Sequence, residues 1–355
     1  IILGKTNTPE FGLACYTEPD VAPPARTPFD LNRSAGGSSG GAAAAVSAGL
    51  VAVAQGSDGA GSIRIPASVC GLVGLKPSRG RVSGGPLLAD VSGLAVNGPI
   101  ARSVADAAAM LDVMAGPTPG DPYWAPPLPA GETFLAATQR PPPRLRIGVT
   151  KEPVIADSEL DEACDDAFES AVSLLEELGH SVARCPRIFA PALVPEFELI
   201  WAAGAASIPV PAEKERELRP LTRWLRDRGR GADAPRLLSA LSTVQIAARQ
   251  AVVALSSFDV VVTPTLAQRP ALVGAIRDDD DPERDFERQK RFTPFTAPAN
   301  LTGQPAISLP LHWTDDGLPI GIQIIGAPAG ETVLLSLAAD IERARPWSDR
   351  LPAVW

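Results

Sequence analysis

The sequence is poor in the residues from which many catalytic and metal centres are built. Its 355 residues include only two histidines, His180 and His312, and only four cysteines. Two histidines leave almost nothing from which to build a Ser-His-Asp triad or a histidine-ligated metal centre. The cysteines form neither a disulfide framework nor a pair at metal-ligand spacing, which favours reduced thiols in a cytoplasmic protein. We therefore expect neither a metal nor a cofactor.

Positive charge is also scarce. Lys and Arg total 32 against 41 Asp and Glu, so the formal net charge is −9. Such a chain is a poor binder of polyphosphate, and we expect no nucleic-acid partner. The stretch 34–57 carries no charge, but it is mostly Gly, Ala and Ser and lacks the bulky apolar content of a membrane span. We accordingly expect no membrane association, and a homodimer is allowed.

The order of the elements predicts an α/β protein. Residues 1–3 are expected to be the end of a strand. Further strands are expected at 51–55, 145–149, 181–185, 259–263, 306–310 and 320–325. Helices are expected at 38–50, 104–115, 159–178, 212–228, 235–258 and 331–345. Strands that alternate with helices indicate a sheet covered by helices on both faces.

Two stretches are expected to be loops. Residues 116–144 contain nine prolines and should form an extended surface loop. The acidic run at 278–281, continued by Glu283 and Asp285, has no EF-hand spacing, so a solvated loop is favoured over a metal site. A domain boundary in the first stretch is not required, and we expect one domain over residues 1–355.

The most informative segment holds two glycine clusters, Gly-Gly-Ser-Ser-Gly-Gly at 36–41 and Gly-Ser-Asp-Gly-Ala-Gly-Ser at 56–62. Neither cluster has the Gly-Lys-Ser/Thr ending or the Gly-x-Gly-x-x-Gly spacing of a phosphate-binding loop. Tight helix packing and turns would explain the glycines, but not the serines beside an aspartate and an arginine. The backbone N–H groups of residues 59–62 can instead converge on one point as an oxyanion hole, with Ser62 placed to attack the bound carbonyl. With so little histidine, a Ser–Lys arrangement with a second serine as proton relay is the economical source of a base.

In these motifs the sequence resembles the amidase signature family. The resemblance rests on the two clusters, on Ile-Arg-x-Pro after Ser62, on Cys-Gly at 70–71 and on Gly-Leu-Lys-Pro at 74–77. It extends to Gly-Lys-Thr-Asn at 4–7 and to Gly-Leu-Pro-Ile-Gly-Ile-Gln at 317–323, and so covers almost the whole chain. It implies a mixed, twisted central sheet in an α/β/α fold. The sequence of these motifs is most similar to that of the stand-alone amidases in the branch that includes 6-aminohexanoate-cyclic-dimer hydrolases.

The resemblance also implies roles for individual residues. The nucleophile falls on Ser62 and the relay, which in the family follows a cis peptide bond, falls on Ser38. The oxyanion donors fall on Gly59, Ala60, Gly61 and Ser62, and the supporting positions on Ser39, Asp58 and Arg64. Ala60 stands where glycine is common, and it would strain the loop if the position required a positive φ.

The family's general-base lysine is the serious departure from the pattern, because its position lies before residue 1; Ser57, where threonine is common, and Ala60 are mild ones. Lys5 and Lys76 match family lysines outside the catalytic trio. We therefore expect this chain to lack the N-terminal segment of the family pattern. A polypeptide limited to residues 1–355 should be prone to aggregation and hydrolyse amides at least about 10²-fold more slowly than the complete protein.

The function implied is hydrolysis of a small-molecule carboxylic amide, not a peptide, through an acyl-enzyme on Ser62. Two alternatives stay open: an A-type subunit of a tRNA-dependent amidotransferase complex, and a catalytically silent or truncated relative. Four residues are candidates for the pocket wall, although each is more often a core or surface residue: Trp201, Phe292, Phe295 and Asn300.

Overall fold

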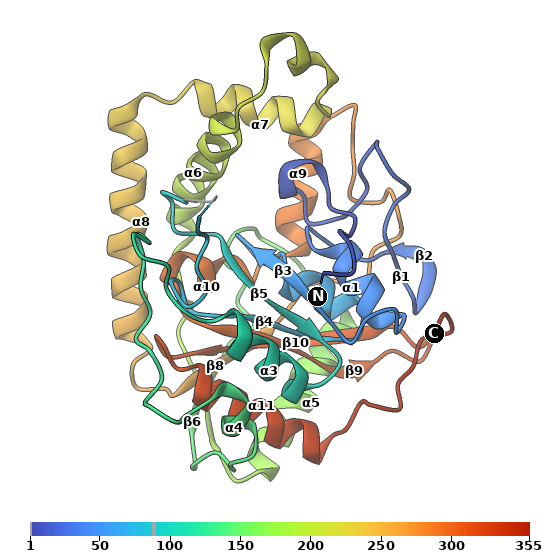
Figure 1. Ribbon diagram of the computed structural model, residues 1–355, viewed down its shortest axis with the longest axis vertical. Coiled ribbons are helices and arrows are strands. Elements are labelled where there is room, and N and C mark those ends of the chain that lie inside the picture. The colour runs from blue at the N-terminus through green and yellow to red at the C-terminus, as the bar shows by residue number, and fades with distance from the viewer. Residues whose placement is uncertain (1, 87–89) are drawn as a thin grey trace.

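An eight-stranded mixed β-sheet runs through the middle of the molecule (Figure 1). The computed structural model describes residues 2–86 and 90–355. The strands of this sheet are β3 (Val53–Asp58), β4 (Val73–Lys76), β5 (Val96–Ala101), β6 (Arg146–Val149), β7 (Ser181–Arg184), β8 (Val260–Pro264), β9 (Ala306–Trp313) and β10 (Pro319–Gly326). Their order is β3-β5-β4-β9-β10-β8-β6-β7, antiparallel from β3 to β8 and parallel from β8 to β7. A separate hairpin pairs β1 (Arg26–Thr27) with β2 (Asp30–Ser34).

Helices cover both faces of the sheet, which confirms the predicted α/β/α class. One layer contains α3 (Val104–Met114), α4 (Phe134–Thr138), α5 (Glu162–Glu177) and α11 (Glu331–Ala344), seen below the sheet in Figure 1. The other layer contains α1 (Gly40–Ser47), α2 (Arg64–Val69), α6 (Val194–Ser207), α7 (Pro220–Arg230), α8 (Ala234–Ala254), α9 (Pro282–Phe292) and α10 (Ala297–Thr302). Among the described residues there are also three short 3-10 helices: η1 (Glu10–Gly12), η2 (Pro191–Leu193) and η3 (Ala212–Glu217).

The central strand β10 shows how the sequence divides the two layers. Because side chains alternate along a strand, Ile320, Ile322 and Ile324 face the core formed with α5 and α11. The intervening Gly321 and Gln323 face the opposite layer. At Gly321 a Cβ would lie 2.5 Å from the Ser68 hydroxyl oxygen of α2, so glycine allows α2 to pack directly on the sheet. The alternation therefore places the polar Gln323 side chain under α2.

The strongly patterned helices agree with the sequence. The amphipathic helix predicted at 159–178 is α5, and Asp161 caps it by accepting a hydrogen bond from the Ala163 N–H. The helix predicted at 104–115 is α3, and the Ser103 hydroxyl accepts from the Asp106 N–H, as its capping pattern indicates. The expected strand pair near the C-terminus is β9 and β10, which are antiparallel.

Some predictions of secondary structure were wrong. Ile2 and Leu3 are not in a strand, and Ile1 lies outside the described residues. The helix predicted at 212–228 is divided into η3 and α7, because Pro220 cannot continue a preceding helix. The predicted loop at 116–144 contains α4, whose Phe134 is buried in the core.

The acidic run divides at residue 281, because residues 278–281 form a loop, as predicted, whereas Glu283 and Asp285 lie in helix α9. Asp281 caps this helix by accepting from the Arg284 N–H, and Pro282 occupies the first turn. Asp285 is fully buried, and the Tyr16 hydroxyl donates to its carboxylate at 2.5 Å. The negative charges of this run are therefore partly structural.

Helix α8 is long and apolar enough for a membrane span by length and composition alone. It packs against α6 and α10 through a stripe of small residues that includes Ala240, Val244 and Ala248. Core helices pass the same test of length and composition, so this property carries no further conclusion.

Candidate active site

Ser62 lies in the short connection between β3 and α2. The connection turns sharply at Gly61, whose φ of +132° favours glycine. A Cβ at Gly61 would also lie 2.4 Å from the Thr296 hydroxyl oxygen, so only glycine fits between α10 and this loop. The loop thereby places Ser62, whose exposed fraction is 8%, at the surface of two cavities.

Ser38 lies just before α1, after a cis peptide bond between Gly37 and Ser38. The backbone here is backed by the segment 12–16. A Cβ on Gly37 would lie 2.6 Å from the Tyr16 backbone nitrogen, and one on Gly12 would lie 3.5 Å from the Ser38 hydroxyl oxygen. The close approach of two backbones therefore fixes the position of Ser38.

The structure brings the two serines together, although 24 residues separate them in the sequence. Both line one cavity of about 230 Å³, here called the large cavity, together with Gly59 and Ser57. The Ser39 N–H donates to the Ser62 carbonyl oxygen at 3.1 Å, which joins the two loops directly. The Ser39 hydroxyl also bonds both the N–H and the carbonyl oxygen of Ser57, so Ser39 braces α1 against β3.

The N–H groups of the loop differ in their availability. The Asp58 carboxylate accepts from the Gly61 N–H at 2.7 Å and from the Ile63 N–H at 3.1 Å. Gly61 therefore departs from its predicted role, because its N–H is already bound. In the described chain, the N–H groups of Gly59, Ala60 and Ser62 donate to no protein acceptor. These three N–H groups are therefore available to donate hydrogen bonds to an oxyanion.

The substitution of alanine for glycine at position 60 does not strain the loop. Among the described residues, only Phe11 and Ala329 have a positive φ without being glycine. The Ala60 carbonyl oxygen accepts a hydrogen bond from the Thr296 hydroxyl at 2.5 Å. The loop is therefore held from α10 at two adjacent positions.

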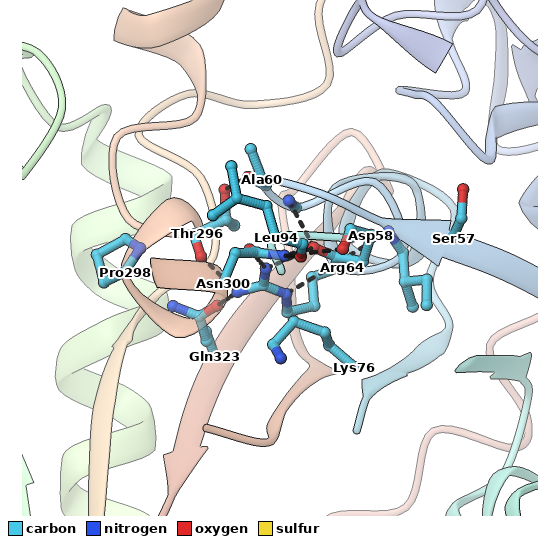
Figure 2. A network of polar contacts seen from close by, with 12 residues as sticks. Ser57, Asp58, Ala60, Arg64, Lys76, Leu94, Thr296, Pro298, Asn300 and Gln323 are labelled. Carbon is cyan, nitrogen blue, oxygen red and sulfur yellow. Dashed lines mark hydrogen bonds and ion pairs between the residues drawn. The ribbon is translucent and has the colours of Figure 1, made fainter. Parts of the chain in front are cut away.

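A buried ionic network supports this loop from below (Figure 2). Arg64 pairs with the Asp58 carboxylate through two nitrogens, at 2.7 and 3.0 Å, and both side chains are fully buried. Arg64 also donates to the Asn300 side-chain oxygen at 2.6 Å and to the Gln323 side-chain oxygen at 2.5 Å. Burial alone would raise the pKa of Asp58, but the charge and hydrogen bonds of Arg64 lower it to about 2. Asp58 is therefore a structural anion.

Lys76 lies next to this network and away from the serines. Burial and the nearby charge of Arg64 lower the pKa of Lys76 to about 7. Its ammonium donates to the Pro77 carbonyl oxygen at 2.9 Å, and Lys76 lines neither cavity at Ser62. In Figure 2, Arg64 lies between Lys76 and Ala60.

The other lysines and the histidines do not supply a base at Ser38. Lys5 is exposed, and Lys151 and Lys214 pair with carboxylates elsewhere on the surface. Lys290 lines a cavity beside Ser62, but its ammonium is bound by two carboxylates and Ser38 does not line that cavity. Neither histidine lines a cavity at Ser62.

One of the four expected wall residues lines the site. Trp201 of α6 lines both cavities, and its ring lies 3.2 Å from the place of a Cβ on Gly59. Phe292 and Phe295 are core residues, with exposed fractions of 2% and 1%. Asn300 belongs to the Arg64 network, where its amide donates to the Asp58 carbonyl oxygen at 2.8 Å.

Sequence reasoning missed several residues at the site. Thr296 and Gln323 hold the loop and Arg64, and Phe197 and Gln289 line the smaller cavity. The polar Gln323 among isoleucines of a buried strand is a signal that could have been used, because such a side chain needs a partner. The Thr296 contact has no comparable local signal.

Comparison with known proteins agrees with this geometry. The family model described as Amidase matches residues 1–335. The chain belongs to the amidase family. It is 39% identical over 375 residues to the 6-aminohexanoate-cyclic-dimer hydrolase of Paenarthrobacter ureafaciens, covering 99% of this chain and 75% of that protein. This chain spans 65% to 75% of the length of the curated relatives that it matches first.

Solved structures of amidase-family proteins share the fold. The structure of 6-aminohexanoate cyclic dimer hydrolase complexed with substrate matches with a TM-score of 0.89 and 36% identity, covering 100% of this chain and 77% of that one. The A-type subunit of the glutamyl-tRNA(Gln) amidotransferase of Thermotoga maritima matches with a TM-score of 0.80 and 32% identity, at 100% and 77% coverage. The predicted family and fold are therefore confirmed, together with the similarity to cyclic-dimer hydrolases.

Proposed function

We propose that this protein hydrolyses a carboxylic amide C–N bond through an acyl-enzyme on Ser62. The observation that carries the proposal is the shared cavity of Ser38 and Ser62, bordered by N–H groups that have no protein acceptor. A nucleophile needs a proton acceptor within hydrogen-bond reach and a site for the developing oxyanion. Ser38 before α1 and the loop after β3 offer the two in one cavity.

The reaction proceeds in two steps. The Ser62 oxygen attacks the amide carbon while its proton passes to Ser38, which passes its own proton to the general-base lysine that the family resemblance implies. The tetrahedral oxyanion is bound by the N–H groups of Gly59, Ala60 and Ser62. The C–N bond then breaks, the nitrogen takes the proton from Ser38, and the amine leaves. Water attacks the resulting ester by the same route and releases the carboxylic acid.

An amidotransferase component is the second candidate, supported by the structural match to the Thermotoga maritima protein. In that case the reaction would depend on partner chains. Two other chains would then co-purify with the natural protein, and isolated protein would not turn over simple amides. A stand-alone amidase requires no such chains.

The nucleophile is tested by Ser62→Ala in the full natural polypeptide. We expect turnover of an aryl amide and labelling by a serine-directed phosphonate to be lost, with an unchanged circular dichroism spectrum. Ser38→Ala should lower kcat by about 10²–10⁴, the range for a proton-transfer group. Ser173→Ala is the control, because Ser173 is an exposed serine of α5 that lines neither cavity at Ser62. Near-normal turnover by Ser62→Ala would refute the nucleophile.

A further inference from the structure

Two cavities of different character meet at Ser62. The large cavity was described above, and the small cavity has a volume of about 50 Å³. Among described residues, three line both: Ser62, Leu13 and Trp201. Ser62 thus stands at a partition formed by Leu13 and the Trp201 ring, and a bound amide must extend to both sides of it.

The small cavity presents an apolar surface. Its walls include Ile65, Ile155, Phe197 and Phe286. The side chains of Gln289, Lys290 and Thr293 in its wall are already bonded. The Gln289 side chain, for example, accepts from the Cys15 N–H at 2.9 Å and donates to the Asp285 carboxylate at 2.7 Å.

The cation of the small cavity is also neutralised. The Lys290 ammonium, on a side chain with 8% exposure, lies 2.5 Å from carboxylate oxygens of both Glu198 and Glu287. One positive charge therefore faces two negative charges. An acyl group that carried its own carboxylate would find no unpaired cation here and would be repelled.

The relay serine distinguishes the two cavities chemically. Ser38 lines the large cavity and not the small one. When the tetrahedral intermediate collapses, the departing nitrogen must receive a proton from a group within hydrogen-bond reach. The nitrogen must therefore point into the large cavity, and the acyl carbon chain into the small one.

We propose that the small cavity binds the acyl part of the substrate and the large cavity its amine part. The substrate class is then an amide of a short, neutral, apolar acid with a larger and more polar amine. This assignment rests on the proposed amidase function. A volume of about 50 Å³ has room for about two water-sized groups at about 30 Å³ each, which corresponds to an acyl chain of roughly two carbons beyond the carbonyl group at Ser62.

The large cavity suits an amine with polar substituents. Its lining residues include Ser57, Asp90 and Ser92 besides Ser38. The Asp90 carboxylate is fixed by the N–H groups of Ser92 and Ala95, at 2.9 and 2.7 Å. The wall therefore carries a fixed negative charge that favours a polar or cationic amine part.

Two variants on α6 separate the cavities. Phe197 lines only the small cavity and Ile200 only the large one, one helical turn apart, with exposed fractions of 4% and 5%. Phe197→Leu and Ile200→Ala each remove three side-chain carbons. The full natural polypeptide and both variants are assayed on acetyl, butyryl, hexanoyl and succinyl anilides, and on acetyl amides of aniline and naphthylamine.

We expect kcat/KM of the parent enzyme to fall about tenfold or more from butyryl to hexanoyl, and from butyryl to succinyl. In Phe197→Leu the fall in kcat/KM from butyryl to hexanoyl should be less than about threefold, whereas in Ile200→Ala it should be as large as in the parent enzyme. Ile200→Ala should instead raise the relative rate on the naphthylamide. Circular dichroism checks the fold, and Ile155→Val replaces Phe197→Leu if that variant does not fold.

The outcomes separate the two proposals. If Ile200→Ala relieves the limit on acyl length and the small-cavity variant does not, the assignment is reversed and our inference is overturned. If neither variant changes how kcat/KM depends on acyl length, the inference is overturned as well. If the parent enzyme neither hydrolyses any amide nor reacts with a serine-directed phosphonate, the proposed function itself has failed.

Discussion

Arg64 uses its whole guanidinium group within the protein. An arginine side chain has five N–H donors in a fixed planar fork. Arg64 makes five hydrogen bonds: two to Asp58 and one each to Thr296, Asn300 and Gln323. A lysine has three donors and no fork, so it could not join the same groups. The network behind Ser62 therefore depends on arginine at this position.

Replacement of Asp58 by asparagine should be severely destabilising. The amide would place N–H groups against the Arg64 guanidinium and leave a buried charge without its partner. We expect a loss of about 3–5 kcal/mol in the free energy of unfolding, measured by urea denaturation. The matched control is Asp30→Asn, which breaks a partly exposed pair with Arg33 and should cost less than about 1 kcal/mol. Equal effects of the two substitutions would contradict the structural role.

The same carboxylate predicts a pH dependence of stability. The pKa of Asp58 is lowered from its ordinary 3.8 to about 2 in the folded protein. The unfolded chain therefore binds the proton more readily, so the contribution of Asp58 is fully present above about pH 4 and is lost as the pH falls towards 2. Asp58→Asn should lack this part of the acid transition.

Lys76 should destabilise the protein at acidic and neutral pH. Its pKa falls from 10.5 to about 7 on folding, so between these values the unfolded chain binds more protons and stability rises with pH. Lys76→Met should therefore stabilise the protein most below pH 7. This advantage should shrink by up to about 1.4 kcal/mol per pH unit above pH 7. Urea titrations at pH 6 and pH 9 measure the difference.

The activity of Lys76→Met tests a second point. Because Lys76 lines neither cavity, we expect kcat to stay within about threefold of the parent value, far from the loss caused by removal of a general base. A loss of a hundredfold in a folded variant would make Lys76 the base.

At the scale of elements, the β3–α2 connection is held by its contact with α10. Gly61→Ala would drive a methyl group into the Thr296 side chain and displace the N–H groups at Ser62. A displacement of about 1 Å at a catalytic group costs on the order of 10²-fold, so we expect kcat to fall by about that factor. Gly120→Ala is the control, since Gly120 also has a positive φ but nothing within 4 Å of an added Cβ. Similar kcat values for both variants would contradict the packing argument.

The segment 12–16, which backs Ser38, is anchored to α9. The Tyr16 hydroxyl donates a hydrogen bond to Asp285 and accepts one from Arg219. Because these groups are buried, the loss of either hydrogen bond would be costly. Tyr16→Phe should lower the free energy of unfolding by about 1–3 kcal/mol. Tyr123→Phe removes an exposed hydroxyl with a 3.3 Å contact and should change it by less than about 0.5 kcal/mol. Equal urea midpoints for the two variants would mean that the anchor contributes nothing.

Elements with a strong local pattern were predictable from the sequence, and those that depend on distant partners were not. Helix α5 has a clear apolar stripe and a cap, and its prediction is confirmed within a few residues. Helix α6 is apolar around much of its circumference, so its sequence shows no helical period. Helix α9 was hidden by its acidic first turn, although Asp281 and Pro282 form a recognisable start.

At the scale of the whole molecule, the candidate site also divides into parts with a local sequence pattern and parts that depend on distant residues. The two glycine clusters predicted which serines lie together, because their spacing matches a family. The partners of Arg64 could not be predicted, since Thr296, Asn300 and Gln323 lie 232 to 259 residues away in the sequence. The identity of the two cavity walls likewise depends on α6 and α9, whose positions only the fold determines. Local chemistry was therefore visible in the sequence, and its support was not.

The long span of the Arg64 network has a consequence for protein synthesis. Arg64 and Gln323 are separated by 259 residues, so a ribosome that adds about 5–20 residues per second needs roughly 13–50 s to pass from one to the other. During that interval the nascent chain carries both serines but lacks the α10 and β10 groups that hold their loop. On the proposed mechanism, we expect the loop to be held in place only when β10 has been made and docked. A chain that ends before residue 323 should therefore lack amidase activity.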